Sequence, residues 1–170
     1  DWDSGAKAVR EIVQTGQAVS MLRLSDAQET ETTLELSGKE LLVGLANRGL
    51  GMLGYGSGRS LLIFGLTGSR RQTARTLGDV RSTIKPFGGL FTGQTIGKQW
   101  RKSRFHTPYL RNTLWEKGYA LDTLETALSW GKALPAAGEI IAALRQALQA
   151  YGERGLIFAH LSHVLSLIHI

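Results

Sequence analysis

The chain has 170 residues, the length of one ordinary domain, and 42% hydrophobic and 20% charged residues are typical of a globular protein. It has no cysteine, no run near the roughly 18 apolar residues of a membrane-spanning helix, and no signal-peptide pattern at its N-terminus. The net charge is +6, but Lys and Arg are spread along the chain, so we expect no nucleic-acid partner. We expect a cytoplasmic protein and leave membrane association open.

The N-terminal third alternates helices and strands. Capping residues and apolar periodicity predict helices over 4–14, 25–32 and 39–47, and a strand over 18–24. That strand contains Arg23 among apolar residues. Two interpretations stay open: an arginine at the rim of an edge strand, which is the commoner case, or a charged side chain aimed into a site.

The glycine-rich stretch 49–58, GLGMLGYGSG, contains a literal G-x-G-x-x-G. That fingerprint binds a dinucleotide when a strand precedes it and a helix follows it. Here a predicted helix precedes it and a second flexible stretch follows. We therefore reject a dinucleotide site and expect a mobile loop.

The second half continues the alternation of helices and strands. A buried strand at 60–65 leads to a helix at 70–85, which Pro86 ends, and the paired glycines at 88–89 permit a turn. Further strands are predicted at 89–92, around 121–125 and at 155–162, and a further helix at 135–151. This alternation predicts an α+β fold with helices packed on one face of a mostly antiparallel sheet.

Residues 100–111 mix arginines with aromatic side chains more densely than an ordinary core segment does. Arg111, with Tyr109 two residues before it, follows Pro108 on a predicted helix. An arginine there can hold a carboxylate or a phosphate through two parallel hydrogen bonds. The commoner alternative is an exposed helix arginine without a ligand.

Histidine is the usual acid, base or metal ligand, and the chain has four: His106, His160, His163 and His169. In a strand, His160 and His163 would point to opposite faces, so we expect no shared metal ion. No zinc-protease, P-loop or nucleophile-elbow motif is present. As a free-standing enzyme the sequence is therefore unconvincing.

Four segments carry a resemblance to a known family: SMLRLSD (20–26), FGGLFTG (87–93), RFHTPYLRNTLWEKGYALDTLETALSW (104–130) and IFAHLSH (157–163). Together they resemble the C-terminal substrate or cap domain of FAD-linked oxidases, flavoproteins of the vanillyl-alcohol-oxidase type. The nearest resemblance is to bacterial enzymes like alkylglycerone-phosphate synthase (alkyl-dihydroxyacetone-phosphate synthase). The resemblance covers residues 1–164 and implies a ferredoxin-like α+β cap domain, here truncated.

The resemblance implies FAD as cofactor, bound mainly by an N-terminal domain of the same full-length chain that is absent from this sequence. Arg111 corresponds to the family's active-site arginine, and Arg23 to a second arginine needed for activity. Tyr109 and His160 are expected to join Arg111 in binding substrate, whereas cofactor-binding residues in this chain stay unassigned. The substrate would be a small or lipid-like anion, and a homodimer is left open.

Two activities fit this resemblance: exchange of the acyl group of acyl-dihydroxyacetone phosphate for a fatty alcohol, or oxidation of a 2-hydroxy acid such as lactate or glycolate. A non-catalytic α+β binding module with a cationic pocket is the alternative from another class. The last six residues, LSLIHI (165–170), resemble the translation of a transposase end used in sequencing libraries. We expect them to be a non-native tail and the chain to be a fragment that is inactive alone.

Overall fold

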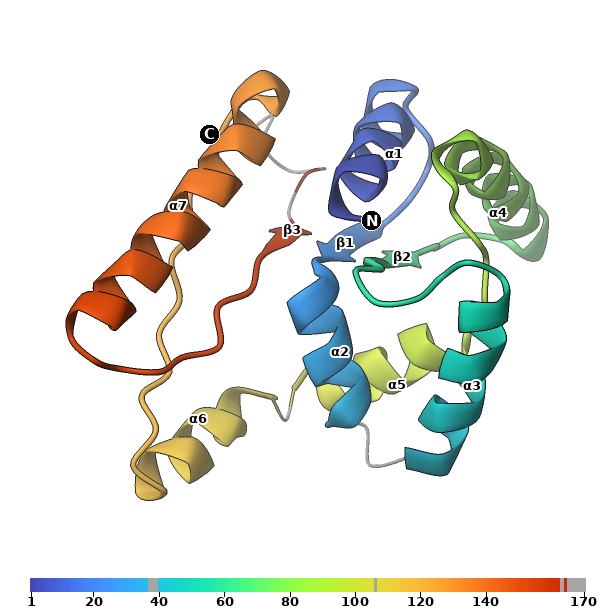
Figure 1. Cartoon of the computed structure of the whole chain (residues 1–170). Coiled ribbons are helices and arrows are strands. Elements are labelled where there is room, and N and C mark those ends of the chain that lie inside the picture. The colour runs from blue at the N-terminus through green and yellow to red at the C-terminus, as the bar shows by residue number, and fades with distance from the viewer. Residues whose placement is uncertain (37–39, 106, 163, 165–170) are drawn as a thin grey trace.

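A computed structural model of the chain describes residues 1–36, 40–105, 107–162 and 164 (Figure 1). Its elements follow in the order α1 (Trp2–Gln14), β1 (Met21–Ser25), α2 (Ala27–Glu35), α3 (Glu40–Met52), β2 (Leu61–Gly65), α4 (Arg70–Ile84), η1 (Lys85–Phe87), α5 (Thr95–Ser103), α6 (Thr107–Glu116), α7 (Trp130–Ala150) and β3 (His160–Ser162). In the described residues the strands form one antiparallel sheet in the order β2-β1-β3. The predicted α+β class with an antiparallel sheet is confirmed.

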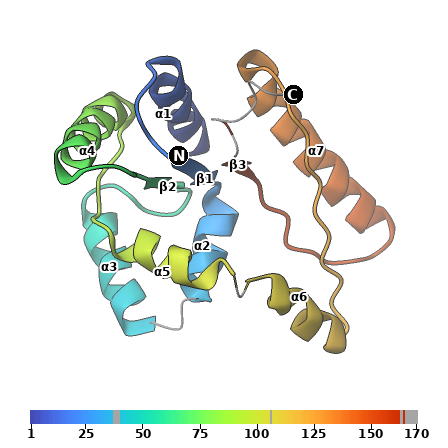
Figure 2. The ribbon, with the colours of Figure 1, turned by 180° about the vertical axis from the view of Figure 1, so that it is seen from behind.

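The hydrophobic core lies between α1, α4 and one face of the sheet. Leu22 and Leu24 of β1 pack there, each almost fully buried, with Ile12 of α1 and Val80 of α4. Figures 1 and 2 show α1 and α4 side by side along the strands. A predicted strand of alternating apolar residues and two amphipathic helices therefore account for the centre of the molecule.

The opposite face of the sheet carries Arg23. The register pairs Arg23 with Ile63 on β2 and with Ser162 on β3, and pairs Ser25 with His160. Cross-strand partners share a face, as do residues two apart on one strand, so Arg23 and His160 point to the same side. Because β1 is the central strand, the interpretation of Arg23 as an edge-strand residue is wrong.

Four segments differ from the sequence-based expectation. Residues 89–92 and 121–125 form no strand, and of the predicted strand 155–162 only the last three residues pair. Alternation is a local signal, and a strand also needs a neighbour with free backbone groups to bond. The predicted loop at 49–58 begins inside a helix, because α3 continues to Met52.

The long helix α7 begins five residues earlier than expected, so Pro135 lies inside it rather than at its start. Ser129 takes the extended N-cap conformation there, and Trp130 packs against the core. The helix α5 (Thr95–Ser103) was not expected. The turn at the paired glycines agrees with the prediction, since Gly88 has a φ of 73° and a Cβ on Gly89 would lie 2.8 Å from Ile84 Cβ.

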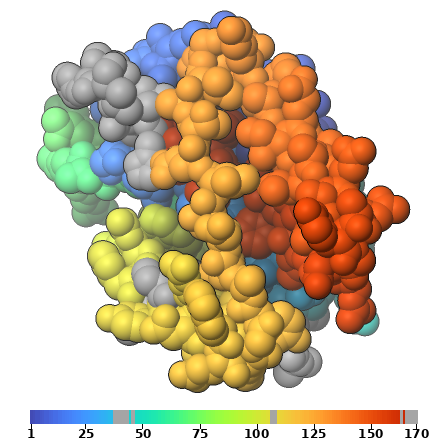
Figure 3. Space-filling model, turned by 90° about the vertical axis from the view of Figure 1, so that its left-hand side faces the viewer, coloured from blue at the N-terminus to red at the C-terminus, as the bar shows by residue number. Residues whose placement is uncertain are grey.

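Much of the chain between α5 and β3 lies at the periphery, although Trp130 and Leu134 of α7 pack against the core. In Figure 3 the extended residues 119–129 run over the surface between α6 and α7. Several large apolar side chains in this part are exposed, among them Trp115, Leu124 and Phe158. Within the described residues, no helix combines the length and the apolar character needed to cross a membrane.

Candidate functional site

The site begins at the end of β1, where Asp26 caps the N-terminus of α2. Its Oδ1 accepts a hydrogen bond of 2.8 Å from the backbone N–H of Glu29. An Asp followed three residues later by Glu predicts a capping box, in which the Glu carboxylate accepts from the N-cap N–H. Here the N–H of Asp26 donates instead to the carbonyl of Ala159, at 2.9 Å. The Glu29 carboxylate is therefore available for another partner.

That partner is Arg23, six residues earlier on β1. Its Nη2 donates a charge-assisted hydrogen bond to Glu29 Oε1 at 2.5 Å. The residue Glu29 is only 7% exposed, and its second oxygen, Oε2, is buried without a hydrogen-bond partner among the described residues. Burying this carboxylate costs free energy, and the ion pair with Arg23 offsets part of that cost.

Asp26 also brings the C-terminal strand to this position. Its Oδ2 accepts from the backbone N–H of Ala159 at 2.8 Å, which pins the start of β3 against β1. His160 follows directly, and its Nδ1 lies 3.1 Å from Arg23 Nη2 and 3.4 Å from Glu29 Oε1. One arginine, one carboxylate and one imidazole from β1, α2 and β3 therefore form one cluster, here called the Arg23–Glu29–His160 cluster.

The electrostatics of the cluster favour an ionised carboxylate. Burial acts to raise the pKa of the Glu29 carboxyl, but hydrogen bonds from His160 and Ser25 and the charge of Arg23 together outweigh it. The net result is a pKa for Glu29 below its ordinary value of 4.5. The cluster remains accessible from solvent, since the Arg23 and His160 side chains are 24% and 37% exposed.

Two of the predicted site residues, Arg23 and His160, are thus brought together, whereas the other two lie elsewhere. Arg111 and Tyr109 belong to α6, away from the sheet in both ribbon views (Figures 1 and 2). The Arg111 guanidinium carbon lies 5.8 Å from the centre of the Trp115 ring, in a cation–π geometry. Of the other histidines, His106, His163 and His169 lie outside the described residues, as does the tail 165–170.

The residue that sequence reasoning missed is Glu29. The signal that could have found it is the D-x-x-E spacing directly after a strand that carries an arginine. Within the described ranges, no three His, Asp or Glu side chains come together as a metal site requires.

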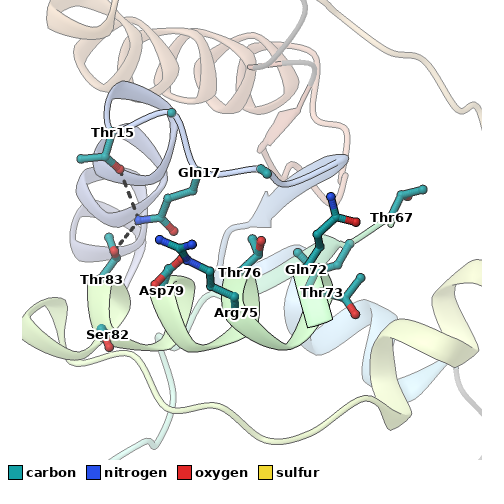
Figure 4. Close-up of a pocket in the computed structure, with 13 residues that line it drawn as sticks. Thr15, Gln17, Thr67, Gln72, Thr73, Arg75, Thr76, Asp79, Ser82 and Thr83 are labelled. Atoms are coloured by element: carbon teal, nitrogen blue, oxygen red, sulfur yellow. Dashed lines mark hydrogen bonds between the residues drawn. The ribbon is translucent and has the colours of Figure 1, made fainter. Parts of the chain in front are cut away.

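A separate groove of about 640 Å³ lies between the C-terminal end of α1 and α4 (Figure 4). Hydroxyl and amide side chains dominate its lining, and Gln17 Nε2 donates to Thr83 Oγ1 at 2.6 Å and to Thr15 Oγ1 at 3.2 Å. Arg75 and Asp79 lie beside them on α4. None of the predicted site residues lines this groove.

The glycine-rich fingerprint does not fit the diphosphate of a dinucleotide such as FAD. Gly49 and Gly51 lie in the last turn of α3, and Gly54 follows the helix with a φ of 85°. Phosphates bind at helix N-termini, where N–H groups point outward, whereas a helix C-terminus presents carbonyl groups and negative potential. The rejection of a dinucleotide site at this stretch agrees with the structure.

Comparison with known proteins bears on the whole chain rather than on single residues. No curated protein and no solved structure shows a significant match. The family model described as "FAD linked oxidases, C-terminal domain" matches residues 1–166. With nearly the whole chain matched, this protein belongs to the family of FAD-linked oxidase C-terminal domains.

Proposed function

We propose that this chain is the substrate-binding, or cap, part of an FAD-dependent oxidoreductase or of an alkylglycerone-phosphate synthase-like transferase. The observation that carries the proposal is the Arg23–Glu29–His160 cluster, which gathers hydrogen-bond donors on an accessible face of the sheet. The family match supports the class of enzyme. The FAD-binding domain of the same full-length chain is the proposed partner, because the glycine-rich stretch of this chain does not fit the diphosphate.

Arg23 is suited to bind an anionic or acyl oxygen. Its Nη2 is taken by Glu29 and His160, while Nε and Nη1 form no hydrogen bond to another described residue. These two nitrogens lie on either side of Cδ and do not form a parallel pair, but Nη1 can donate a charge-assisted hydrogen bond to a carboxylate or phosphate oxygen. His160, with its partly exposed ring, would complete the contact to the same substrate.

The cluster alone provides little net positive charge, because Glu29 neutralises Arg23. A second cation would therefore strengthen the binding of an anion. We propose Arg111 for this role, because it is the position that the family resemblance implies, with Tyr109, which is 68% exposed, beside it on α6. Arg111 would contact substrate in the assembled enzyme, and the 170-residue chain by itself would have no turnover.

Binding to the isolated chain tests the proposal. We expect glycolate and dihydroxyacetone phosphate, added separately, to shift the NMR signals of the Arg23 side chain and the His160 ring. Whichever compound binds more tightly indicates whether hydroxy-acid oxidation or acyl/alkyl exchange is the better assignment. Arg23→Gln should abolish these shifts, whereas Arg71→Gln, at an exposed position of α4, should not.

An absence of shifts at both residues with both compounds would contradict the assignment of Arg23 and His160 as substrate-binding residues. A non-catalytic binding module of the same fold would then be the better description. Turnover of either compound by the isolated chain would contradict the proposed dependence on a separate FAD-binding domain.

A further inference from the structure

The outward side of α4 carries a concentration of positive charge. Between residues 70 and 85 the sequence has five basic residues and one acidic residue, so this stretch has a net charge of +4. The basic residues are all exposed and are here called the α4 cationic face: Arg70, Arg71, Arg75, Arg81 and Lys85. Like charges this close on one helix repel one another, so the arrangement costs stability unless an anion faces it.

The five cations share one side of the helix. An α-helix turns by about 100° per residue, which places them within an arc of about 140°. Lys85 belongs to this arc because it keeps helical dihedrals as the C-cap. The buried residues Thr76, Val80 and Ile84 lie on the opposite side, toward the core. Asp79 falls outside the arc, on the side of the groove next to α1.

The charges of this face are not neutralised within the described part of the chain. None of the five cations is in an ion pair there, and the Arg81 guanidinium carbon lies 5.3 Å from the centre of the Phe91 ring. Figure 1 shows α4 as the outermost element on its side of the molecule. It packs on the core face of the sheet, whereas Arg23 and His160 lie on the other face. A partner bound to α4 therefore leaves the Arg23–Glu29–His160 cluster free.

We propose that the α4 cationic face docks this protein on an anionic membrane surface. Four of the five cations are arginines, whose guanidinium groups hold phosphate oxygens through paired hydrogen bonds. The 15-residue helix is roughly 22 Å long, so its face spans several lipid headgroups. Because the lipids of a fluid bilayer move in the plane, each cation can meet a phosphate at whatever spacing the helix gives it.

The centre of the face determines the kind of binding. Between the cations lie the small residues Ala74, Gly78 and Ser82, so no large apolar side chain is there to insert between acyl chains. The contact is therefore electrostatic and lies at the headgroups, where each basic residue strengthens binding about fivefold. The same arc of the helix has no aromatic or amide side chain to stack on or read a base, so a nucleic acid fits the face less well.

Vesicle flotation tests the proposal on the unmodified chain. We expect binding to phosphatidylcholine vesicles that contain phosphatidylglycerol and none to vesicles of phosphatidylcholine alone. Binding should be lost at about 1 M NaCl, where the screening length falls to about 3 Å. No binding to the anionic vesicles at low salt would overturn the proposal, as would equal binding to both kinds of vesicle, because exposed apolar side chains would then be responsible. Tighter binding to a DNA duplex than to anionic vesicles at the same salt would overturn it in favour of a nucleic acid.

A charge-removal variant and a matched control locate the contact. Arg70→Gln/Arg75→Gln/Lys85→Gln should weaken binding to anionic vesicles on the order of a hundredfold. The control removes three charges from α5, which lies on the other face of the sheet, where a Cβ on Gly97 would be 3.8 Å from Ile63 Cγ2. It is Lys98→Gln/Arg101→Gln/Lys102→Gln, and it should weaken binding less than about tenfold. Equal weakening by the two variants would overturn the assignment to α4, since only net charge would then matter.

A single thiol reports the contact without removing a charge, because the chain has no cysteine. A fluorescent label on Ser82→Cys, at the centre of the face, should become protected from a water-soluble quencher when anionic vesicles are added. The same label on Gln146→Cys, exposed on α7, should stay accessible. A label at position 82 that stays accessible in the vesicle-bound chain would overturn the proposal, whatever the three-charge variant does. None of these results depends on whether glycolate binds at Arg23, so this proposal and the proposed function fail separately.

Discussion

The Asp26 carboxylate holds the start of β3, and with it His160, in addition to the backbone pairing of β3 with β1. Asp26 accepts from the N–H of Glu29 through Oδ1 and from the N–H of Ala159 through Oδ2, both at 2.8 Å. Asp26→Asn leaves one acceptor oxygen, so only one of these two bonds can persist. Asp26→Ala removes both.

The magnitudes follow from the kinds of bond lost. A hydrogen bond to a charged group contributes about 1.5–3 kcal/mol, so Asp26→Asn should lower the free energy of unfolding by about that amount. Loss of the cap as well costs about another 0.5–2 kcal/mol, which makes Asp26→Ala the more destabilised variant. Where Asn keeps the cap, the N–H groups of β3 should exchange roughly tenfold to a hundredfold faster, because the strand opens more easily.

Urea denaturation and amide hydrogen exchange measure the two effects on the same samples. Asp79→Asn, an exposed carboxylate on α4, serves as the control and should leave β3 exchange unchanged. If Asp26→Asn showed the same stability and the same β3 exchange as the unmodified chain, Asp26 would not be what joins β3 to the sheet. The account of how His160 reaches Arg23 would then be wrong.

Three further predictions concern stability. The pKa of Glu29 in the folded protein lies below its ordinary value of 4.5, so the ionised carboxylate contributes to the free energy of unfolding above that pH, and this contribution is lost as the pH falls through the folded pKa. Glu29→Gln should therefore make the free energy of unfolding, measured by denaturation, less dependent on pH on the acid side. Leu24→Ala should lower the free energy of unfolding by about 2–5 kcal/mol, since Leu24 is 1% exposed in the core, and a loss below about 1 kcal/mol in thermal or urea unfolding would contradict that placement. Gly89→Ala should destabilise the protein by roughly 1–3 kcal/mol, because its Cβ would lie 2.8 Å from Ile84 Cβ. Gly78→Ala in α4 has open space around it and should stabilise the protein by about 0.5–1 kcal/mol. Equal melting temperatures for the two variants would count against this contrast.

Some residues of the candidate site could be identified from the sequence, whereas their contacts could not. Arg23 was identifiable as a charged residue in an apolar strand, and His160 as part of a motif in a predicted strand. Their contact was not predictable, because it depends on the register of two strands whose residues are 137 positions apart. Glu29 was missed because its local pattern predicts a capping role, which the backbone of a distant segment fills instead.

The sequence by itself determined the elements whose signals are short-range. The core strand β1, the strand β2 and the helices α1 and α4 were predictable within a few residues, because alternation, apolar periodicity, caps and stops act over neighbouring residues. It also determined the family, whose motifs span the chain. Only the tertiary structure decided which extended segments become strands. Residues 121–125 have the alternation but no neighbouring strand to bond, whereas the end of 155–162 pairs with β1 and is also held by Asp26. The same pairing decided that an arginine, a buried glutamate and a histidine meet on one face, since their contact is a property of register and not of any one segment.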